Sequence, residues 1–324
     1  MDRRLAVAIL IFINVLWGSS YGITKVVLAE IPPVLFGALR WIIGAFLLWS
    51  IQLWLWSRQP KGSKSAMASV SSEDRLRLMS LGVFSMGIAF ILAYNGINLT
   101  TATDASLMIS AEVFFTSLLA AWVAHEALGR VKFFGMLLGA AGVTILVLGH
   151  LTGAGGESNG WNRTLGDLLI LINLAMQAVY TVFGTGLARK YPPLTMLTFV
   201  CTGSLLVWIP ILLWYLFSGN FPHALSLRAL SGLIYLSVVT SIICNFIWFS
   251  ISTRLGAGLT AISLFAQPLV GSLIGLLFLN EPLTRSLIVG AILVFVALYL
   301  ITIAPLTASK SVEVRPASLP LTDI

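Results

Sequence analysis

The sequence predicts an all-α integral membrane protein with ten transmembrane helices, arranged as two inverted five-helix repeats. Of its 324 residues, 58% are hydrophobic and only 10% are charged, whereas a soluble protein carries about 25% charged residues. The apolar residues occur in blocks of about twenty, the length with which a helix crosses the hydrocarbon core of a bilayer. An internal repeat, residues 94–128 and 249–283 at a constant offset of 155, predicts the arrangement.

The apolar blocks do not alternate every second residue, so they predict helices and not the strands of a barrel. In the first half the predicted helices are residues 5–24, 34–56, 76–97, 104–124 and 132–149. In the second half they are residues 165–186, 194–217, 227–250, 257–279 and 286–304. Prolines mark the start of the second helix in each half, Pro32–Pro33 and Pro192–Pro193, because proline fits the first helical turn.

These helices divide the chain into two repeats, residues 1–149 and 165–304. A polar linker rich in Gly and Asn, residues 150–164, separates them, and residues 305–324 are predicted to form a disordered cytoplasmic tail. In each copy of the internal repeat, one helix ends at small residues and the next helix runs down to a glutamate, Glu126 or Glu281.

Lysine and arginine predict how the chain crosses the membrane. All but five of the 19 basic residues fall in loops on the side of the N-terminus; the five others are Lys25, Arg40, Arg163, Arg228 and Arg285. The positive-inside rule therefore places both termini in the cytoplasm. Because each half has an odd number of spans, the second half inserts upside down relative to the first, an arrangement typical of secondary transporters.

Three segments resemble the EamA family of the drug/metabolite transporter superfamily: WGSSYGITK at residues 17–25, PPVLFGALRW at residues 32–41, and the two glutamate-ended helices. The resemblance covers about residues 5–304. It implies a ten-helix secondary transporter of the cell membrane with a central cavity, which exports small metabolites such as amino acids. The proline frequent near the start of the fourth and ninth helices of this family is present as Pro268, whereas Val113 stands at the equivalent first-half position.

Polar and aromatic side chains at membrane depth are energetically costly and usually face a cavity or another helix. On this ground thirteen residues are candidates for substrate binding: Trp17, Tyr21, Lys25, Tyr94, Asn95, Asn98, Glu112, Asn173, Gln177, Tyr180, Asn245, Trp248 and Gln267. The alternative for the amides and rings is hydrogen bonding and packing between helices. For Lys25 the alternative is a position at the membrane surface.

Glu112 is the most informative single candidate, because it lies about 12 Å along its predicted helix. Two interpretations stay open: Glu112 binds substrate or a coupling proton, or it forms a structural pair with Arg40. Its second-half counterpart is Gln267. Two further structural pairs are predicted from a spacing of four residues, Glu126 with Arg130 and Glu281 with Arg285.

The sequence contains no motif of a hydrolase, metalloprotease or nucleotide-binding ATPase, so it predicts neither an enzyme nor a bound cofactor or metal. The expected partners are a small-molecule substrate, the lipid bilayer and protons as coupling ion, and no nucleic acid. The predicted function is export of a small amphipathic metabolite by alternating access. Three alternatives remain: an importer or exchanger of a similar solute, a non-transporting membrane protein, and a flippase for a lipid-linked sugar.

Overall fold

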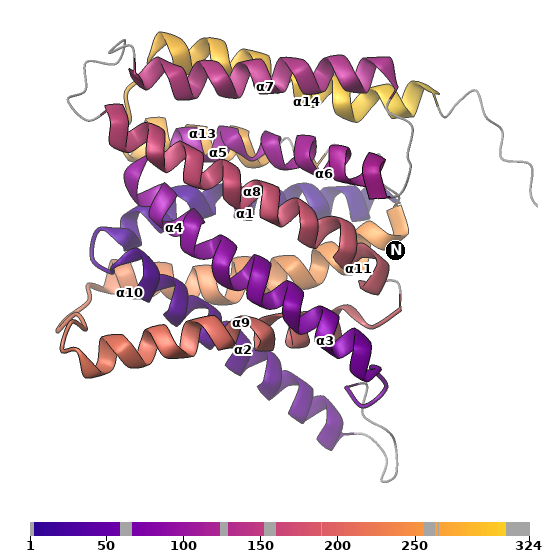
Figure 1. Cartoon of the computed structure of the whole chain (residues 1–324), viewed down its shortest axis with the longest axis vertical. Helices are drawn as coiled ribbons and strands as arrows, with labels where there is room; N and C mark the ends of the chain where they lie inside the picture. The colour runs from indigo at the N-terminus through magenta and orange to yellow at the C-terminus, as the bar shows by residue number, and fades with distance from the viewer. Residues whose placement is uncertain are drawn as a thin grey trace, which may run out of the picture.

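A computed structural model describes residues 3–58, 67–123, 129–151, 160–188, 190–255, 263–264 and 266–308. Throughout these ranges the chain forms helices and their connections, with no strand. The helices run roughly side by side in stacked layers (Figure 1). Seven continuous helical stretches in the described ranges are long and apolar enough to cross a membrane. The all-helical membrane class is thus as predicted.

The helices of the first half are α1 (Arg3–Leu28), α2 (Pro33–Ser57), α3 (Ser72–Leu81), η1 (Gly82–Ile88), α4 (Ala89–Leu99), α5 (Ala102–Met108), α6 (Ser110–Val123) and α7 (Arg130–Leu151). Those of the second half are α8 (Gly160–Ala188), α9 (Pro193–Phe217), α10 (Leu227–Ile234), η2 (Tyr235–Ile243), α11 (Cys244–Leu255), α13 (Ala266–Phe278) and α14 (Arg285–Ala308). Pro33 and Pro193 occupy the first turns of α2 and α9, as the sequence predicts.

Several predicted helices are not regular. The segments η1 and η2 are π-helical and interrupt the predicted helices 76–97 and 227–250 at equivalent positions. The predicted helix 104–124 divides at Ile109, a turn residue between α5 and α6. A uniformly apolar block gives no signal for such breaks. Hydrophobicity predicts that the block is helical, but it does not predict which carbonyl each backbone amide bonds to.

Two predicted boundaries need correction. The predicted linker 150–164 is helical at both described ends, because α7 extends to Leu151 and α8 begins at Gly160. The predicted tail begins too early, since α14 continues to Ala308. Proline inside a helix that crosses a membrane is tolerated when neighbouring groups satisfy the freed carbonyl, so Pro305 does not end α14.

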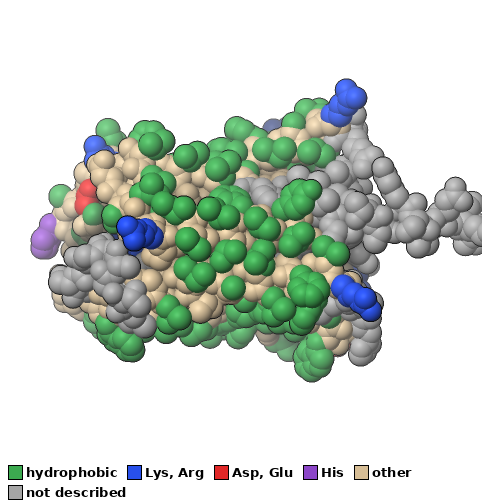
Figure 2. Space-filling view, turned by 90° about the horizontal axis from the view of Figure 1, so that it is seen from above, with side chains coloured by type: hydrophobic (Ala, Val, Ile, Leu, Met, Phe, Trp, Pro, Cys, Tyr) green, Lys and Arg blue, Asp and Glu red, His purple; other side chains and the backbone are tan. Residues whose placement is uncertain are grey.

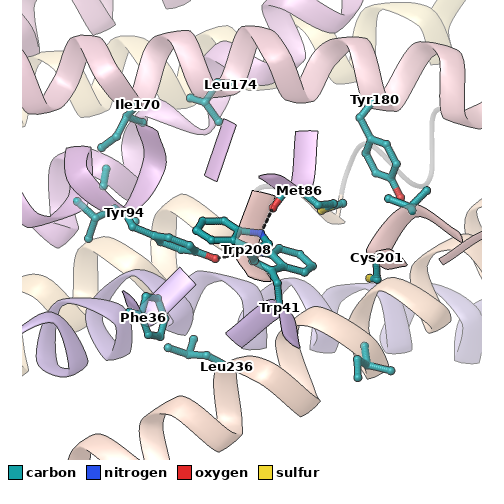
Figure 3. Packing of buried hydrophobic residues seen from close by; sticks show 14 of the residues in the cluster. Phe36, Trp41, Met86, Tyr94, Ile170, Leu174, Tyr180, Cys201, Trp208 and Leu236 are labelled. Atoms are coloured by element: carbon teal, nitrogen blue, oxygen red, sulfur yellow. Dashed lines mark hydrogen bonds between the residues drawn. The ribbon is translucent and has the colours of Figure 1, made fainter. Parts of the chain in front are cut away.

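An aromatic cluster joins α2, α4 and α9 in the core (Figure 3). Trp208 is fully buried, and its indole Nε1 donates a hydrogen bond of 2.8 Å to the carbonyl of Met86 in η1. The indole of Trp41 donates to the hydroxyl of Tyr94 at 3.1 Å. Phe36 packs edge-on against Tyr94, with ring centroids 4.8 Å apart. The π-helical segment thus supplies a carbonyl that a buried indole needs.

The contacts of α3 and η1 with α9 leave no room for side chains at two glycines. A Cβ atom at Gly82 would overlap the backbone carbonyl of Val200, and one at Gly203 would overlap the backbone of Met79. Backbone atoms cannot rotate away as a side chain can. The two halves of the chain therefore meet here at the closest distance that helices allow.

The helices α7 and α14 pair closely with each other and form an outer layer (Figure 1). Small residues permit this contact, since Gly142 lies against the carbonyl of Gly290. Seen from the side of this layer, hydrophobic side chains spread over the middle of the molecule (Figure 2). Such an apolar face suits contact with lipid tails.

Gly82→Ala is expected to lower the free energy of unfolding by about 1–3 kcal/mol, because the added methyl group separates η1 from α9. The matched control is Gly186→Ala, at a helical position with nothing within 4 Å of the added carbon. This control is expected to be neutral or to stabilise by up to ~1 kcal/mol. Thermal unfolding of the detergent-solubilised proteins compares them. Equal melting temperatures for Gly82→Ala and wild type would contradict the close contact.

Candidate functional site

The helix α1 lies inside the bundle and carries the predicted aromatic face of Trp17 and Tyr21. The indole of Trp17 donates a hydrogen bond of 2.9 Å to the carbonyl of Thr240 in η2. Its ring lies 5.5 Å from that of Trp248 in α11. Tyr21 is half-buried and lies within electrostatic range of both Glu112 and Arg40. The structure therefore brings together four residues that the sequence selected, from the three helices α1, α6 and α11.

Arg40 is buried in α2 beside these residues. Its Nε donates to the hydroxyl of Ser241 at 2.8 Å, and its Nη2 donates to the hydroxyl of Thr240 at 2.9 Å. The guanidinium also lies 5.7–5.9 Å from the ring centroids of Trp41, Phe90 and Tyr94. Among the described residues, no carboxylate forms an ion pair with Arg40. Its positive charge is held by neutral hydroxyls and aromatic faces.

Glu112 stands in the first turn of α6, directly after the break at Ile109. A carboxylate at this place is stabilised by the free amides and the dipole of the helix N-terminus. Thr181 of α8 donates to its Oε1 at 3.4 Å, a long hydrogen bond. In the described structure Glu112 does not pair with Arg40, whose donors are directed to η2 instead. Both charges therefore lie inside the bundle without an ion-pair partner among the described residues.

In the second half, the position equivalent to Glu112 is the uncharged Gln267. Leu264 is a turn residue before α13, as Ile109 is before α6, although only the second half has proline nearby. Gln267 donates from Nε2 to Oδ1 of Asn14 at 2.5 Å, and Asn14 donates to the hydroxyl of Ser263 at 2.9 Å. Gln267 thus closes a hydrogen-bonded link to α1. Asn14 was not among the predicted residues, although a buried amide in an apolar block could have revealed it.

The remaining amides mostly bond to backbone carbonyls. Asn173 donates to Ala89 at 2.9 Å and Gln177 to Ser85 at 3.5 Å, both across helices. Asn95 and Asn245 donate within their own helical regions, to Ile91 at 2.7 Å and to Ser241 at 3.0 Å respectively. These contacts are of the kind expected if the amides have a structural role, which was the alternative to substrate binding.

Three other candidates are placed differently. Tyr94 is 1% exposed and belongs to the aromatic core (Figure 3), where its ring centroid lies 5.8 Å from the Arg40 guanidinium. Tyr180 is buried and packs edge-on against Phe249, with ring centroids 6.1 Å apart. The side chain of Asn98 is exposed at the end of α4. Of these three, Tyr94 is the one that borders a central charge.

Lys25 and Glu281 satisfy helix ends instead of facing the centre. The ammonium of Lys25 donates to the carbonyls of Ile97, Asn98 and Thr100 at 2.9, 2.9 and 2.5 Å, at the C-terminus of α4. The carboxylate of Glu281 accepts from the amides of Ala102 and Thr103 at 2.7 and 2.8 Å, at the N-terminus of α5.

The predicted pair of Glu281 with Arg285 does not form, because α5 offers Glu281 free amides. Spacing along the sequence could not reveal this contact between the two halves. The other predicted pair, Glu126 with Arg130, involves a glutamate that lies outside the described residues.

An ion pair that the predictions missed lies at the same end of the bundle. Arg163 of α8 contacts Asp104 of α5 at 2.5 Å, and both side chains are almost fully buried. The hydroxyl of Thr100 donates to Asp167 of α8. These residues connect the first half to the second half next to Lys25 and Glu281.

A cavity of about 180 Å³ lies between α6, α7, α8 and α14, apart from the central charges. Phe114, Phe115, Met136 and Leu171 contribute apolar walls. Its two hydroxyl groups already donate to carbonyls nearby in the sequence, Ser110 to Leu107 of α5 and Thr144 to Ala140 of α7. The cavity therefore suits a hydrocarbon group. In the described part of the chain, no cluster of His, Cys, Asp or Glu is arranged to hold a metal ion.

Arg40→Met and Arg163→Met remove the same charge from two buried sites, with different expected effects. Arg40→Met is expected to leave the melting temperature unchanged or raised, because Thr240 and Ser241 keep their hydrogen bonds to the Leu236 carbonyl. Arg163→Met removes the ion-pair partner of buried Asp104 and is expected to cost about 3–5 kcal/mol. Thermal unfolding in one detergent compares them, and equal destabilisation by both changes would contradict this account.

Known proteins resemble this chain in sequence or in fold. A transporter of unassigned function from Archaeoglobus fulgidus is 26% identical over 290 residues, covering 89% of this chain and 93% of its own length. A probable amino-acid metabolite efflux pump from Salmonella typhimurium is 25% identical over 297 residues, covering 90% and 92%. A solved crystal structure aligns with 96% of this chain and 100% of its own, with a TM-score of 0.64 at 19% identity.

The match to a family profile gives the strongest evidence for the family of this chain. The profile of the EamA-like transporter family matches residues 4–148 and again residues 164–303, one match in each half of the chain. The resemblance expected from the segments around Trp17, Pro32 and the two glutamate-ended helices is therefore confirmed. The chain belongs to the EamA-like transporter family.

Proposed function

We propose that this chain is a ten-helix secondary transporter of the cytoplasmic membrane, with both termini in the cytoplasm. It exports a small amphipathic metabolite such as an amino acid by alternating access. The observation that carries this proposal is a pair of opposite charges, Arg40 and Glu112, that lie inside the bundle near Tyr21 without pairing with each other. A buried charge is costly unless it has a partner, so a bound solute is the natural partner of each.

Alternating access is supported by the likeness of the two halves. The segments η1 and η2, and the turns at Ile109 and Leu264, stand at equivalent positions. The contacts repeat as well, since Trp17 and Gln177 are related by an offset of 160 and each donates to a carbonyl of the π-helical segment in the opposite half. Besides the seven long stretches, the described part of the chain has three shorter apolar helices, residues 133–149, 266–278 and 285–300, which brings the apolar helices found there to ten. Inverted repeats of this kind support two related states around a midplane site.

An amino acid fits the central charges well. Its carboxylate would contact the Arg40 guanidinium, and its ammonium group would contact the Glu112 carboxylate. The rings of Trp17, Tyr21 and Trp248 offer apolar surface for a side chain. Export is supported by the name of the Salmonella relative, a probable amino-acid metabolite efflux pump.

Glu112 is also the group we propose for proton coupling. A carboxylate inside the membrane can carry a proton in one state and bind the substrate ammonium in the other, so the two ligands exclude each other. No other carboxylate among the described residues lies beside Arg40 and Tyr21. Transport would then follow a proton gradient through competition at one side chain.

The test is efflux of radiolabelled amino acids from reconstituted vesicles, with and without a pH gradient. Wild type is expected to export at least one amino acid faster when the gradient drives protons inward. Glu112→Gln is expected to lose this dependence on the gradient while it still exchanges substrate. Glu73→Gln, which changes an exposed carboxylate paired with Arg77, is the matched control and is expected to behave as wild type.

Other outcomes favour the alternatives. Net uptake under the same gradients would make the protein an importer or exchanger. Movement of a fluorescent lipid-linked sugar between leaflets, without amino-acid transport, would favour a flippase. If wild type moves none of these compounds, the non-transporting alternative is supported and the proposal fails. If Glu112→Gln retains the full gradient dependence, proton coupling lies elsewhere.

A further inference from the structure

One end of the bundle, where five segments meet, is held together by charged side chains. At this end α1 finishes, α4 ends, α5 and α8 begin and α13 is followed by the segment containing Glu281 (Figure 1). We call the charged members the end cluster: Lys25, Asp104, Arg163, Asp167 and Glu281. Lys25 lies within electrostatic range of Glu281 and Arg163, which places the contacts in one connected region.

Most of these contacts join the first half to the second. Arg163 of α8 donates from Nε and Nη2 to Oδ2 of Asp104 in α5, at 3.0 and 2.5 Å. Asp167 of α8 accepts from the hydroxyl of Thr100. Glu281 accepts from both Ala102 and Thr103 at the start of α5. Lys25 adds α1 to α4 within the first half.

The packing around Glu281 leaves no free space. A Cβ atom at Gly275 of α13 would overlap both the Thr103 hydroxyl and the Glu281 carboxylate. The hydroxyl of Thr103 itself donates to Glu281 at 2.5 Å. Around Gly275 the two segments therefore meet through backbone and polar atoms, so a separation of this end breaks hydrogen bonds to Glu281.

The opposite end has no equivalent set of charges in the sequence. With the offsets of 160 and 155, Lys25 corresponds to Thr185, Asp167 to Val7 and Asp104 to Leu259. Only Arg163 and Glu281 have charged counterparts, Arg3 and Glu126. Two halves that are alike in fold thus carry unequal charges at their two ends.

We propose that the end cluster is a latch that holds this end of the transporter closed and must separate before the central residues open to this side. The inference rests on the proposed function, because alternating access requires each end to open in turn. With the N-terminus in the cytoplasm, α1 ends at the outer surface, so the latch closes the outward path. Its unequal charges bias the resting protein toward the state that is closed outside.

Hydrogen–deuterium exchange of the full chain in lipid nanodiscs tests the latch without any substrate. Asp104→Asn and Glu281→Gln are compared with wild type. Each change is expected to raise amide exchange by about tenfold, and to do so together at the ends of α1 and α4 and the starts of α5 and α8. Segments 82–88 and 200–208, where η1 meets α9, are expected to exchange as in wild type.

Ser71→Ala is the matched control, since Ser71 caps α3 at a place outside the end cluster through a bond of 3.2 Å from the Asp74 amide. Its effect is expected to stay within the first turn of α3. If Glu281→Gln raises exchange only in residues 101–106, Glu281 is a simple helix cap and the latch is wrong. A rise throughout the protein would also overturn the latch, because it reports lost stability and not a separated end.

The exchange experiment and the transport experiment test the latch and the proposed function separately. If wild type transports an amino acid but exchange changes only locally, the proposed function stands and the latch falls. If wild type transports nothing and exchange rises across all the joined segments, these segments open together but the proposed function fails, and with it the role of this opening in transport. For active protein, the latch further predicts that Asp104→Asn increases labelling of the central region by a membrane-impermeant reagent added outside. Unchanged labelling would contradict it.

Discussion

The constraint on which this structure depends is that lipid offers no hydrogen bonds to an interrupted helix. The same constraint applies to helix ends that are buried inside the bundle, and the junction between α4 and α5 shows how it is met. Lys25 takes the carbonyls at the end of α4, and Glu281 takes the amides at the start of α5. Thr100, Ala102 and Thr103 are each at most 3% exposed, so these groups take partners from other segments instead of from water. The junction between α4 and α5 is therefore also a place where the two halves are tied together.

The centre follows the opposite rule, because its charges are not mutually satisfied. Arg40 rests on hydroxyls and aromatic rings, and Glu112 on one distant hydroxyl and a helix start. A stability-driven design would pair the two or replace them with apolar residues. Asp104 and Arg163 at the end of the bundle are, in contrast, tightly paired. This difference is the reason for assigning Asp104 and Arg163 to stability and for proposing Arg40 and Glu112 as ligand-binding residues.

Much of the fold follows from composition and periodicity, whereas most of the site does not. The lengths of the apolar blocks and the prolines before α2 and α9 predicted where helices lie, because membrane thickness and proline geometry act locally. The division at Ile109 and the π-helical segments have no local signal in a sequence that is apolar on all sides. The spacing of four residues favoured Arg285 as the partner of Glu281, yet its partners are 178 and 179 residues away in the chain.

The candidate residues divide in the same way. Trp17, Tyr21, Glu112 and Trp248 do lie near one another, because polar and aromatic groups in membranes avoid lipid for a general reason. Tyr94 and Tyr180 share the same chemistry but are part of the packed core. Only the packing of helices distinguishes the two groups. Asn14, which bonds to Gln267, shows that a small amide can matter as much as a charge.

The unequal ends of the two halves have a meaning for how such a protein evolves. In the proposed inverted arrangement, one ancestral position faces opposite surfaces of the same membrane in its two copies. Lys25 and Thr185 are one such position, and Asp167 and Val7 are another. In the proposed alternating-access cycle, substitutions in one copy alone would change how long the protein spends facing each compartment. Selection could then tune the timing of transport while the proposed substrate-binding residues stay the same.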